Sequence, residues 1–191
     1  SAASDVYKRQ FQKCMQLKEN RSKTPLPALE SSEEMEYLAY YDVLTELKNR
    51  RAFEKDVEEM EGKGTPFWIL SMDADNLKKV NDTYGHQRGD EFLKEIAESM
   101  GEIFGQENSY RFGGDEFAVL LADKEEKEIS GLIKDFKANL QKGQTDAFPV
   151  SVSVGAAFCQ DGGYQDILEE ADRKMYQEKE KFKESLRKKQ N

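Results

Sequence analysis

Two stretches decide the fold, Phe67-Trp68-Ile69-Leu70-Ser71-Met72-Asp73-Ala74-Asp75 and Gly113-Gly114-Asp115-Glu116-Phe117-Ala118-Val119-Leu120-Leu121. Each joins an apolar run, typical of a buried strand, to a pair of carboxylates at one end of that run. Carboxylates gathered at strand ends repel one another unless a cation lies between them. Mg²⁺ usually binds through one or two carboxylates together with substrate phosphates. The two stretches therefore predict a metal–nucleotide site at the end of a sheet.

The segments around these stretches alternate between helical and strand patterns. Helices are predicted over about 50–61, from 76, over 87–104, over 125–141 and from 164, with Gly62 and Gly64 ending the first. Strands are predicted over 66–72, 109–112, 116–121 and 148–158. Gly113-Gly114 between two strands is typical of a tight hairpin turn. The order predicts an α/β sandwich, whose central mixed sheet contains an antiparallel hairpin and is flanked by helices.

Composition excludes several classes of function. With 191 residues the chain fits one domain and a helical appendage, and its net charge of -9 argues against a nucleic-acid-binding surface. The apolar runs are too short for a membrane span. Cys14 and Cys159 lie far apart, which favours a reducing, cytoplasmic location. Because His86 is the single histidine, zinc centres and histidine triads are disfavoured, so any metal must be held by carboxylates.

A set of motifs in sequence order resembles the GGDEF family of diguanylate cyclases. The motifs lie within residues 41–179 and are Tyr41–Arg50, Asp73–Asp82, Tyr84–His86, Gly89-Asp90, Gly113–Phe117, Val152–Gly155 and Ala171–Tyr176. The resemblance implies a fold like the nucleotidyl-cyclase and polymerase-palm domains. It also implies a reaction in which two GTP molecules, one on each protomer of a homodimer, condense to cyclic di-GMP and two pyrophosphates. Mg²⁺ or Mn²⁺ is the implied cofactor.

The resemblance also sets the expected domain boundaries. Residues 1–30 are predicted to be an N-terminal helical segment with a linker, because Thr24-Pro25-Leu26-Pro27 interrupts a weak amphipathic pattern. Residues 31–183 are predicted to be the GGDEF catalytic domain, and 184–191 a charged C-terminal tail. An upstream sensory domain is a candidate partner.

The family implies roles for the carboxylate clusters. Asp73 is an expected metal ligand assisted by the Ala74 carbonyl, and Asp115 is an expected metal ligand and general base. Glu116 is a second expected catalytic and metal contact, although neighbouring strand side chains point to opposite faces, so strict geometry lets only one of the pair face Asp73. The alternative for Asp73 is a helix cap, worth about 1 kcal/mol. For Asp75 a helix-capping role is at least as good an interpretation as catalysis, and it is left out of the metal set.

The expected substrate contacts divide into guanine and phosphate binding. A carboxylate can accept the N1–H and N2–H₂ donors that distinguish guanine from adenine, so Asp90, with Asn81, is expected to select GTP. The alternative for Asp90 is a charge near the positive end of a helix. The expected phosphate contacts are the backbone at Gly113 and Gly114 and the side chains of Lys78, Lys179 and Lys183. The family normally has Arg at the last position, and a solvated role for Lys183 is an equal alternative.

One motif departs from the family. An Arg-x-x-Asp product-binding site commonly precedes the hairpin, whereas this chain has Phe104-Gly105-Gln106-Glu107 there, which predicts no feedback inhibition through that site. Two other functions compete with an active cyclase: a non-catalytic GTP-binding module of the same fold, and a helical scaffold protein. The residues present at the expected catalytic and guanine-binding positions argue against the first. The second could explain the charged termini but not the central motifs.

Overall fold

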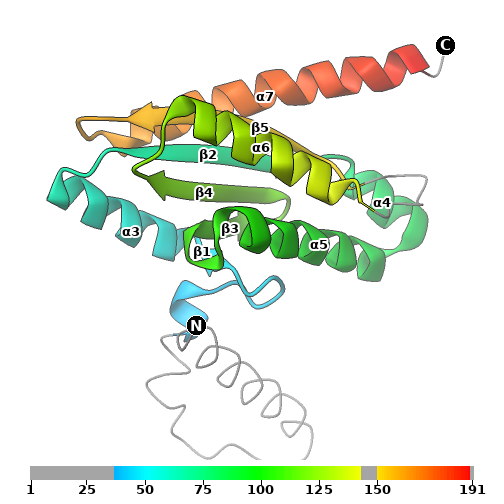
Figure 1. The fold of residues 1–191 in the computed structure, drawn as a ribbon. Helices are drawn as coiled ribbons and strands as arrows, with labels where there is room; N and C mark the ends of the chain where they lie inside the picture. The colour runs from blue at the N-terminus through cyan, green and yellow to red at the C-terminus, as the bar shows by residue number, and fades with distance from the viewer. Residues whose placement is uncertain (1–36, 143–149, 190–191) are drawn as a thin grey trace, which may run out of the picture. The chain divides into compact units, whose positions relative to one another are not determined.

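The computed structural model describes residues 37–142 and 150–189. The chain forms two compact units, residues 1–39 and 40–191, and the helical segment predicted within residues 1–30 lies outside the described residues. The second unit contains a five-stranded sheet of order β1-β3-β4-β2-β5 (Figure 1). Its strands are β1 (Lys48–Asn49), β2 (Phe67–Ala74), β3 (Ser109–Gly113), β4 (Glu116–Ala122) and β5 (Val152–Cys159).

The sheet is mixed, as the sequence predicts. β1 and β3 are parallel, whereas β3–β4, β4–β2 and β2–β5 are antiparallel, and the β3–β4 hairpin occupies interior positions. β2 lies inside the sheet and its side chains pack into hydrophobic clusters on both faces, which explains why its sequence is a continuous apolar run rather than an alternating one. The α/β sandwich is therefore confirmed.

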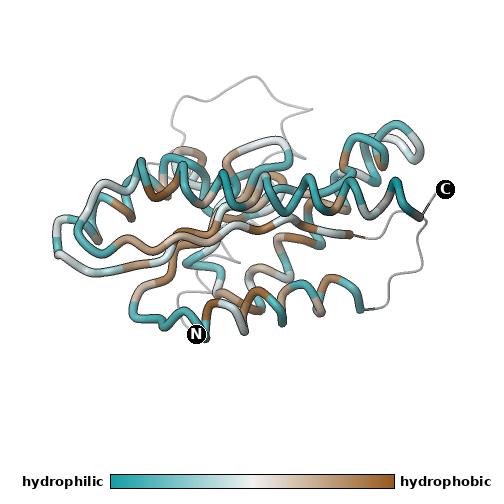
Figure 2. Tube along the Cα trace, turned by 90° about the horizontal axis from the view of Figure 1, so that it is seen from above, coloured by the Kyte–Doolittle hydropathy of each residue, from teal (hydrophilic) through white to brown (hydrophobic). Residues whose placement is uncertain are grey.

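Helices cover both faces of the sheet. They are α3 (Arg50–Lys63), α4 (Leu77–Tyr84), α5 (His86–Phe104), α6 (Glu126–Leu140) and α7 (Tyr164–Lys189), with a short 3₁₀ turn at Gln106–Asn108. Hydrophilic residues predominate along much of the helices, while the strands between them are largely hydrophobic (Figure 2). Side chains along β2 alternate between the two resulting layers.

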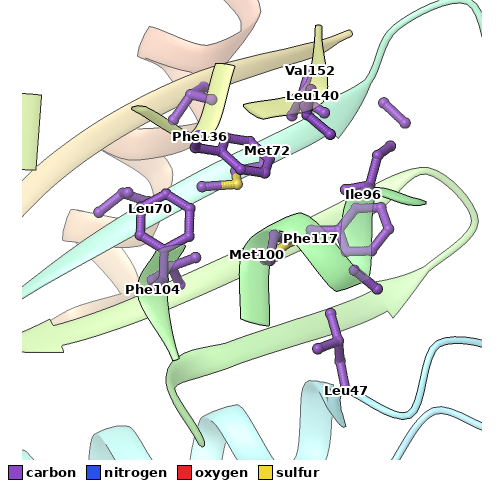
Figure 3. Close-up of a cluster of buried hydrophobic side chains, with 14 of the residues drawn as sticks. Leu47, Leu70, Met72, Ile96, Met100, Phe104, Phe117, Phe136, Leu140 and Val152 are labelled. Atoms are coloured by element: carbon purple, nitrogen blue, oxygen red, sulfur yellow. The ribbon is translucent and has the colours of Figure 1, made fainter. Parts of the chain in front are cut away.

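Two hydrophobic clusters fill these layers. The larger one packs Leu70 and Met72 of β2 against α5 and α6; Ile96, Met100, Phe104 and Phe136 are among its helical members (Figure 3). The smaller one packs Phe67 and Ile69 of β2 against α3 and α7, with Phe53, Val57 and Ala171. Odd-numbered residues of β2 thus face α3 and α7. The next odd position after Ser71 is Asp73, so strand parity directs Asp73 towards the α7 layer.

Local sequence signals explain most element ends, with small differences from expectation. Asn49 caps α3, because its side chain accepts a hydrogen bond from the Ala52 N–H (3.1 Å). Gly62 lies inside α3 rather than ending it, and Gly64 is the C-cap with a positive φ of 65°. Of the strand predicted over 148–158, residues 148 and 149 lie outside the described residues. β5 begins at Val152 rather than at Val150, because its pairing with β2 starts at Ala74↔Val152. No helix in the described residues is long and apolar enough to cross a bilayer.

Candidate active site

The end of β2 meets the β3–β4 turn. The Ala74 N–H donates a hydrogen bond to the Asp115 carbonyl (2.9 Å), and Asp73 lies opposite Glu116 in the β2–β4 register. Directly opposed residues of an antiparallel pair project to the same face. The two carboxylate clusters predicted from the sequence therefore lie together at one end of the sheet.

Asp73 is held by a lysine from α7. It is nearly buried, and the Lys179 ammonium donates a hydrogen bond to Asp73 Oδ1. Burial raises the pKa of Asp73, the bond from Lys179 opposes this rise, and the negative charge of Asp115 adds to it. The ionised form of a buried carboxylate that lies near a second negative charge is stabilised by a positive charge, which Lys179 supplies here.

Asp115 and Glu116 approach Asp73 in different ways. Glu116 is its cross-strand partner and is exposed at the start of β4. Asp115 is half-buried in the turn, and its charge contributes to the raised pKa of Asp73. The alternation of side chains between the two faces applies to residues within a strand. Asp115 precedes the first residue of β4, so this alternation does not fix the direction of its side chain. Both acidic side chains are therefore available to a ligand bound at Asp73.

The donor set fits a hard cation that completes its coordination with ligand oxygens. Within residues 37–142 and 150–189, no three His, Cys, Asp or Glu side chains converge closely enough to hold a metal ion. Mg²⁺ commonly binds through one or two carboxylates and takes its remaining oxygens from water and substrate phosphates. The Asp73 carboxylate, which already binds an ammonium, and the neighbouring Asp115 match that mode.

The capping interpretation of Asp75 is wrong. The N-cap of α4 is Asn76, with φ 64°, while the Asp75 carboxylate is buried and accepts hydrogen bonds from the hydroxyls of Ser151 and Ser153 (2.8 Å each). Burial raises the pKa of Asp75, and the bonds from Ser153 and Ser151 oppose this rise. Asp75 joins the end of β2 to the start of β5, and its two oxygens are committed there.

The hairpin glycines adopt the backbone predicted for them. Gly113 and Gly114 have φ of 136° and 55°, which side-chain-bearing residues rarely adopt. Both are exposed, and a Cβ at either would meet no atom within 4 Å. The reason for glycine at these positions is thus the backbone conformation, and the turn is open for the approach of a phosphate.

A buried arginine supports this turn, and sequence reasoning missed it. Arg111 Nη2 donates to the Gly114 carbonyl and Nη1 to Asp42 Oδ1, both at 2.8 Å. Asp42 Oδ1 also accepts from the Thr45 backbone N–H (2.9 Å) and hydroxyl (2.7 Å). Burial raises the pKa of Asp42, but the bonds from Thr45 and Arg111 outweigh it, and the pKa lies below its usual value. The signal was present in the sequence, because Asp42 and Thr45 belong to the opening motif and Arg111 lies just before the hairpin glycines.

Close packing of α4 on α5 brings the two expected guanine contacts together. Gly89 of α5 lies so near α4 that a Cβ there would be 1.9 Å from Asn81 Oδ1. Asp90, the next residue, is exposed. Asn81 Oδ1 is buried and has no hydrogen-bond partner among the described residues. An unpaired buried acceptor costs free energy, which a ligand donor would recover.

The remaining predicted phosphate contacts have different settings. Lys78 is exposed on α4, the helix that follows β2. Lys183 is exposed on α7, where its ammonium donates a hydrogen bond to Glu180 Oε1 (2.7 Å). This bond raises the pKa of Lys183. This arrangement matches the solvated alternative for Lys183, and its phosphate-binding role stays a prediction.

The fold and this site define an α/β domain with a mixed central sheet and acidic residues at the ends of its central strands. The family model described as "Diguanylate cyclase, GGDEF domain" matches residues 39–185. The chain belongs to the GGDEF domain family.

Individual relatives agree with this assignment. The diguanylate cyclase DosC of Escherichia coli (strain K12) is 32% identical over 146 residues, which cover 71% of this chain and 32% of that protein. Diguanylate cyclase DgcN of the same strain is 35% identical over 159 residues, covering 78% and 39%, respectively. Among solved structures, the GGDEF domain of DgcB from Caulobacter crescentus, in complex with c-di-GMP, superimposes with a TM-score of 0.67 at 27% identity. That match covers 74% of this chain and 91% of the DgcB chain. The present chain thus spans about a third of DosC.

Proposed function

We propose that this chain is the catalytic domain of a diguanylate cyclase, which condenses two GTP molecules to cyclic di-GMP and releases two pyrophosphates. The observation that carries the proposal is the meeting of Asp73 with Asp115 and Glu116 at one sheet end, with Lys179 bound to Asp73. Relatives named diguanylate cyclases match the segment that contains these residues. A homodimer is part of the proposal, because each nucleotide must be attacked by the other.

In the proposed reaction the 3′-hydroxyl of one nucleotide forms a bond to the α-phosphorus of the other, and the bond to pyrophosphate breaks. Asp115 accepts the hydroxyl proton as general base. Asp90 and Asn81 hold the guanine, while Lys179, Lys78 and the open backbone at Gly114 take the phosphates. The protein contributes mainly orientation and electrostatic stabilisation of the charge that develops on the phosphate oxygens.

Asp73 and Asp115 are the residues that would hold Mg²⁺ or Mn²⁺, with the Ala74 carbonyl assisting. Because no three such side chains converge among the described residues, Glu116, which is exposed, would have to turn towards the ion to join them. When bound, the cation lowers the pKa of the attacking hydroxyl and neutralises phosphate charge. The Lys179 ammonium on Asp73 supports this assignment, because it shows that the carboxylate accommodates positive charge.

A direct assay tests the proposal. We expect purified protein incubated with GTP and Mg²⁺ to form cyclic di-GMP and pyrophosphate, measured by chromatography, and to form no cyclic product from ATP. Because a dimer is required, the initial rate should rise with the square of protein concentration when dimerisation is limiting. Binding of GTP without product at any protein concentration would instead identify a non-catalytic GTP-binding module.

Gly89→Ala should separate guanine binding from folding. The added Cβ would lie 1.9 Å from Asn81 Oδ1, so the Asn81 amide must move. The Asn81 amide is the end of a side chain and alanine favours a helix, so we expect the free energy of unfolding to change by less than about 1 kcal/mol. The KM for GTP should rise about tenfold, as expected for one lost hydrogen bond to the base. Gly131→Ala is the matched control, because no atom lies within 4 Å of its Cβ position on α6. An unchanged KM in Gly89→Ala would remove Asn81 from the guanine site.

A further inference from the structure

Glu178 connects α7 to two other elements. Its Oε2 accepts a hydrogen bond from the Val154 N–H of β5 (2.6 Å), and its Oε1 accepts one from the Lys137 ammonium of α6 (2.6 Å). Among the described residues β5 is the last strand of the sheet and pairs only with β2, so a backbone donor on its other side needs a partner from elsewhere. Glu178 meets that need with a charged acceptor, which forms a stronger hydrogen bond than a neutral one.

These bonds lie where close packing between α7 and β5 gives way to a cavity. At Gly155 the two backbones are in contact, since a Cβ there would be 2.0 Å from the Ala171 carbonyl and 2.3 Å from the Met175 nitrogen. Further along α7, a cavity of about 330 Å³ lies between α6, β5 and α7; its lining includes Val152, Ser153, Lys137, Glu178 and Phe182. Beside this cavity close packing is absent, and the hydrogen bonds of Glu178 hold α7 against β5 and α6 instead.

The residue after Glu178 is Lys179, whose ammonium binds Asp73. Consecutive side chains on a helix project about 100° apart, so the rotation and axial position of α7 at Glu178 set where Lys179 points. Lys179 therefore reaches the site from a helix turn that two polar bonds fix.

We propose that Glu178 is a positioning residue: by binding Val154 and Lys137 it sets α7 so that Lys179 is presented to Asp73 and to the phosphates of GTP. This inference rests on the phosphate-binding role of Lys179 in the proposed function. Glu178 itself does not touch substrate in this proposal, and its effect passes entirely through Lys179.

Binding of 3′-deoxy-GTP with Mg²⁺, measured by calorimetry, tests the inference, because this nucleotide cannot be cyclised. Glu178→Ala should weaken binding about tenfold, the scale of one charge-assisted hydrogen bond to phosphate. In a Lys179→Met background the same substitution should have no effect. Glu178→Gln, which keeps an acceptor for Val154 but loses the ion pair with Lys137, should be intermediate and remain folded if Glu178→Ala does not. Equal losses in both backgrounds, or no loss in either, would overturn the inference.

A second readout does not depend on nucleotide. The ammonium resonance of Lys179, assigned by its loss in Lys179→Met, should be slow to exchange in the wild type and broadened or shifted in Glu178→Ala. Glu170→Ala is the matched control: Glu170 also lies on α7 and also has one ion pair, with Lys174 (2.7 Å), but no described bond to a strand. It should leave the resonance unchanged. If the wild type makes no cyclic di-GMP, the proposed function fails, while this resonance still decides whether Glu178 positions Lys179. An identical resonance in Glu178→Ala and wild type would contradict the inference.

Discussion

Asp115→Asn should reduce cyclic di-GMP formation by about 10³-fold, the scale seen when a group that stabilises charge in the transition state is removed. The substitution keeps the shape of the side chain but removes both its charge and its basicity. Asp115 is only half-buried, and its carbonyl bond with the Ala74 N–H is unaffected by the change. The free energy of unfolding should therefore stay within about 0.5 kcal/mol of wild type. Initial rates with GTP and Mg²⁺, together with urea unfolding, check both expectations.

A matched control separates the role of this carboxylate from the loss of one negative charge. Asp135→Asn removes an exposed carboxylate on α6, outside the site, and should leave the rate unchanged. A near-normal rate in Asp115→Asn, with a reduced rate only in Glu116→Gln, would move the general-base role to Glu116, the cross-strand partner of Asp73.

Asp42→Ala should destabilise the domain by about 3–5 kcal/mol, because it leaves the Arg111 guanidinium with an unpaired buried charge. Arg111 is 8% exposed, and among the described residues its Nε already has no hydrogen-bond partner. The Thr45 N–H loses its acceptor as well. Because Arg111 also holds the Gly114 carbonyl, the hairpin turn should loosen and the cyclase rate should fall in protein that remains folded.

The difference in the free energy of unfolding between wild type and Asp42→Ala should change with pH in a defined direction. The folded-state pKa of Asp42 lies below the ordinary aspartate value of about 3.9, so its contribution to stability is fully present above that pH. The contribution is lost as the pH falls through the lowered pKa. The gap between wild type and Asp42→Ala in urea unfolding should thus be constant from neutral pH to about pH 5 and narrow below pH 4.

Glu54→Ala is the control for this second prediction. Glu54 also pairs with an arginine, Arg50, but both side chains are exposed on α3, so the loss should be only about 0.3–0.5 kcal/mol. Equal losses in Asp42→Ala and Glu54→Ala would mean that the Asp42–Arg111 pair has the value of a surface ion pair.

The fold could be predicted from the sequence wherever local pattern and tertiary pairing agree. The apolar run of β2 and the glycine pair between β3 and β4 have one reasonable interpretation each, and the structure confirms both. The start of β5 was misplaced because alternating valines continue the pattern to Val150, whereas strand pairing begins where β2 ends, at Ala74↔Val152. The alternation of apolar residues within one strand cannot show where the neighbouring strand ends, and here that neighbour sets the boundary.

In the site, too, local sequence patterns could be predicted, whereas contacts between distant residues could not. Short motifs were sufficient to place the two carboxylate clusters at one end of the sheet, because both lie at strand ends of one antiparallel pair. The residue directly opposite Asp73 is Glu116, whereas the family resemblance favoured Asp115. The partners of Asp75 were missed, because Ser151 and Ser153 lie 76 and 78 residues away in the sequence. The bonds of Glu178 to Val154 and Lys137 were also missed, since a glutamate in a lysine-rich helix gives no local sign of a strand contact.

The bond between Lys179 and Asp73 has a consequence for the order of events in the proposed cycle. If the proposed function holds, a divalent ion at Asp73 would have to exchange with the ammonium that the protein already provides. The displaced lysine would need another anion, and the phosphates of the incoming nucleotide would supply one. Nucleotide binding and release of Asp73 by Lys179 would then be coupled, so metal without nucleotide should bind weakly. Asp73 would have a cation beside it both before and after the nucleotide binds.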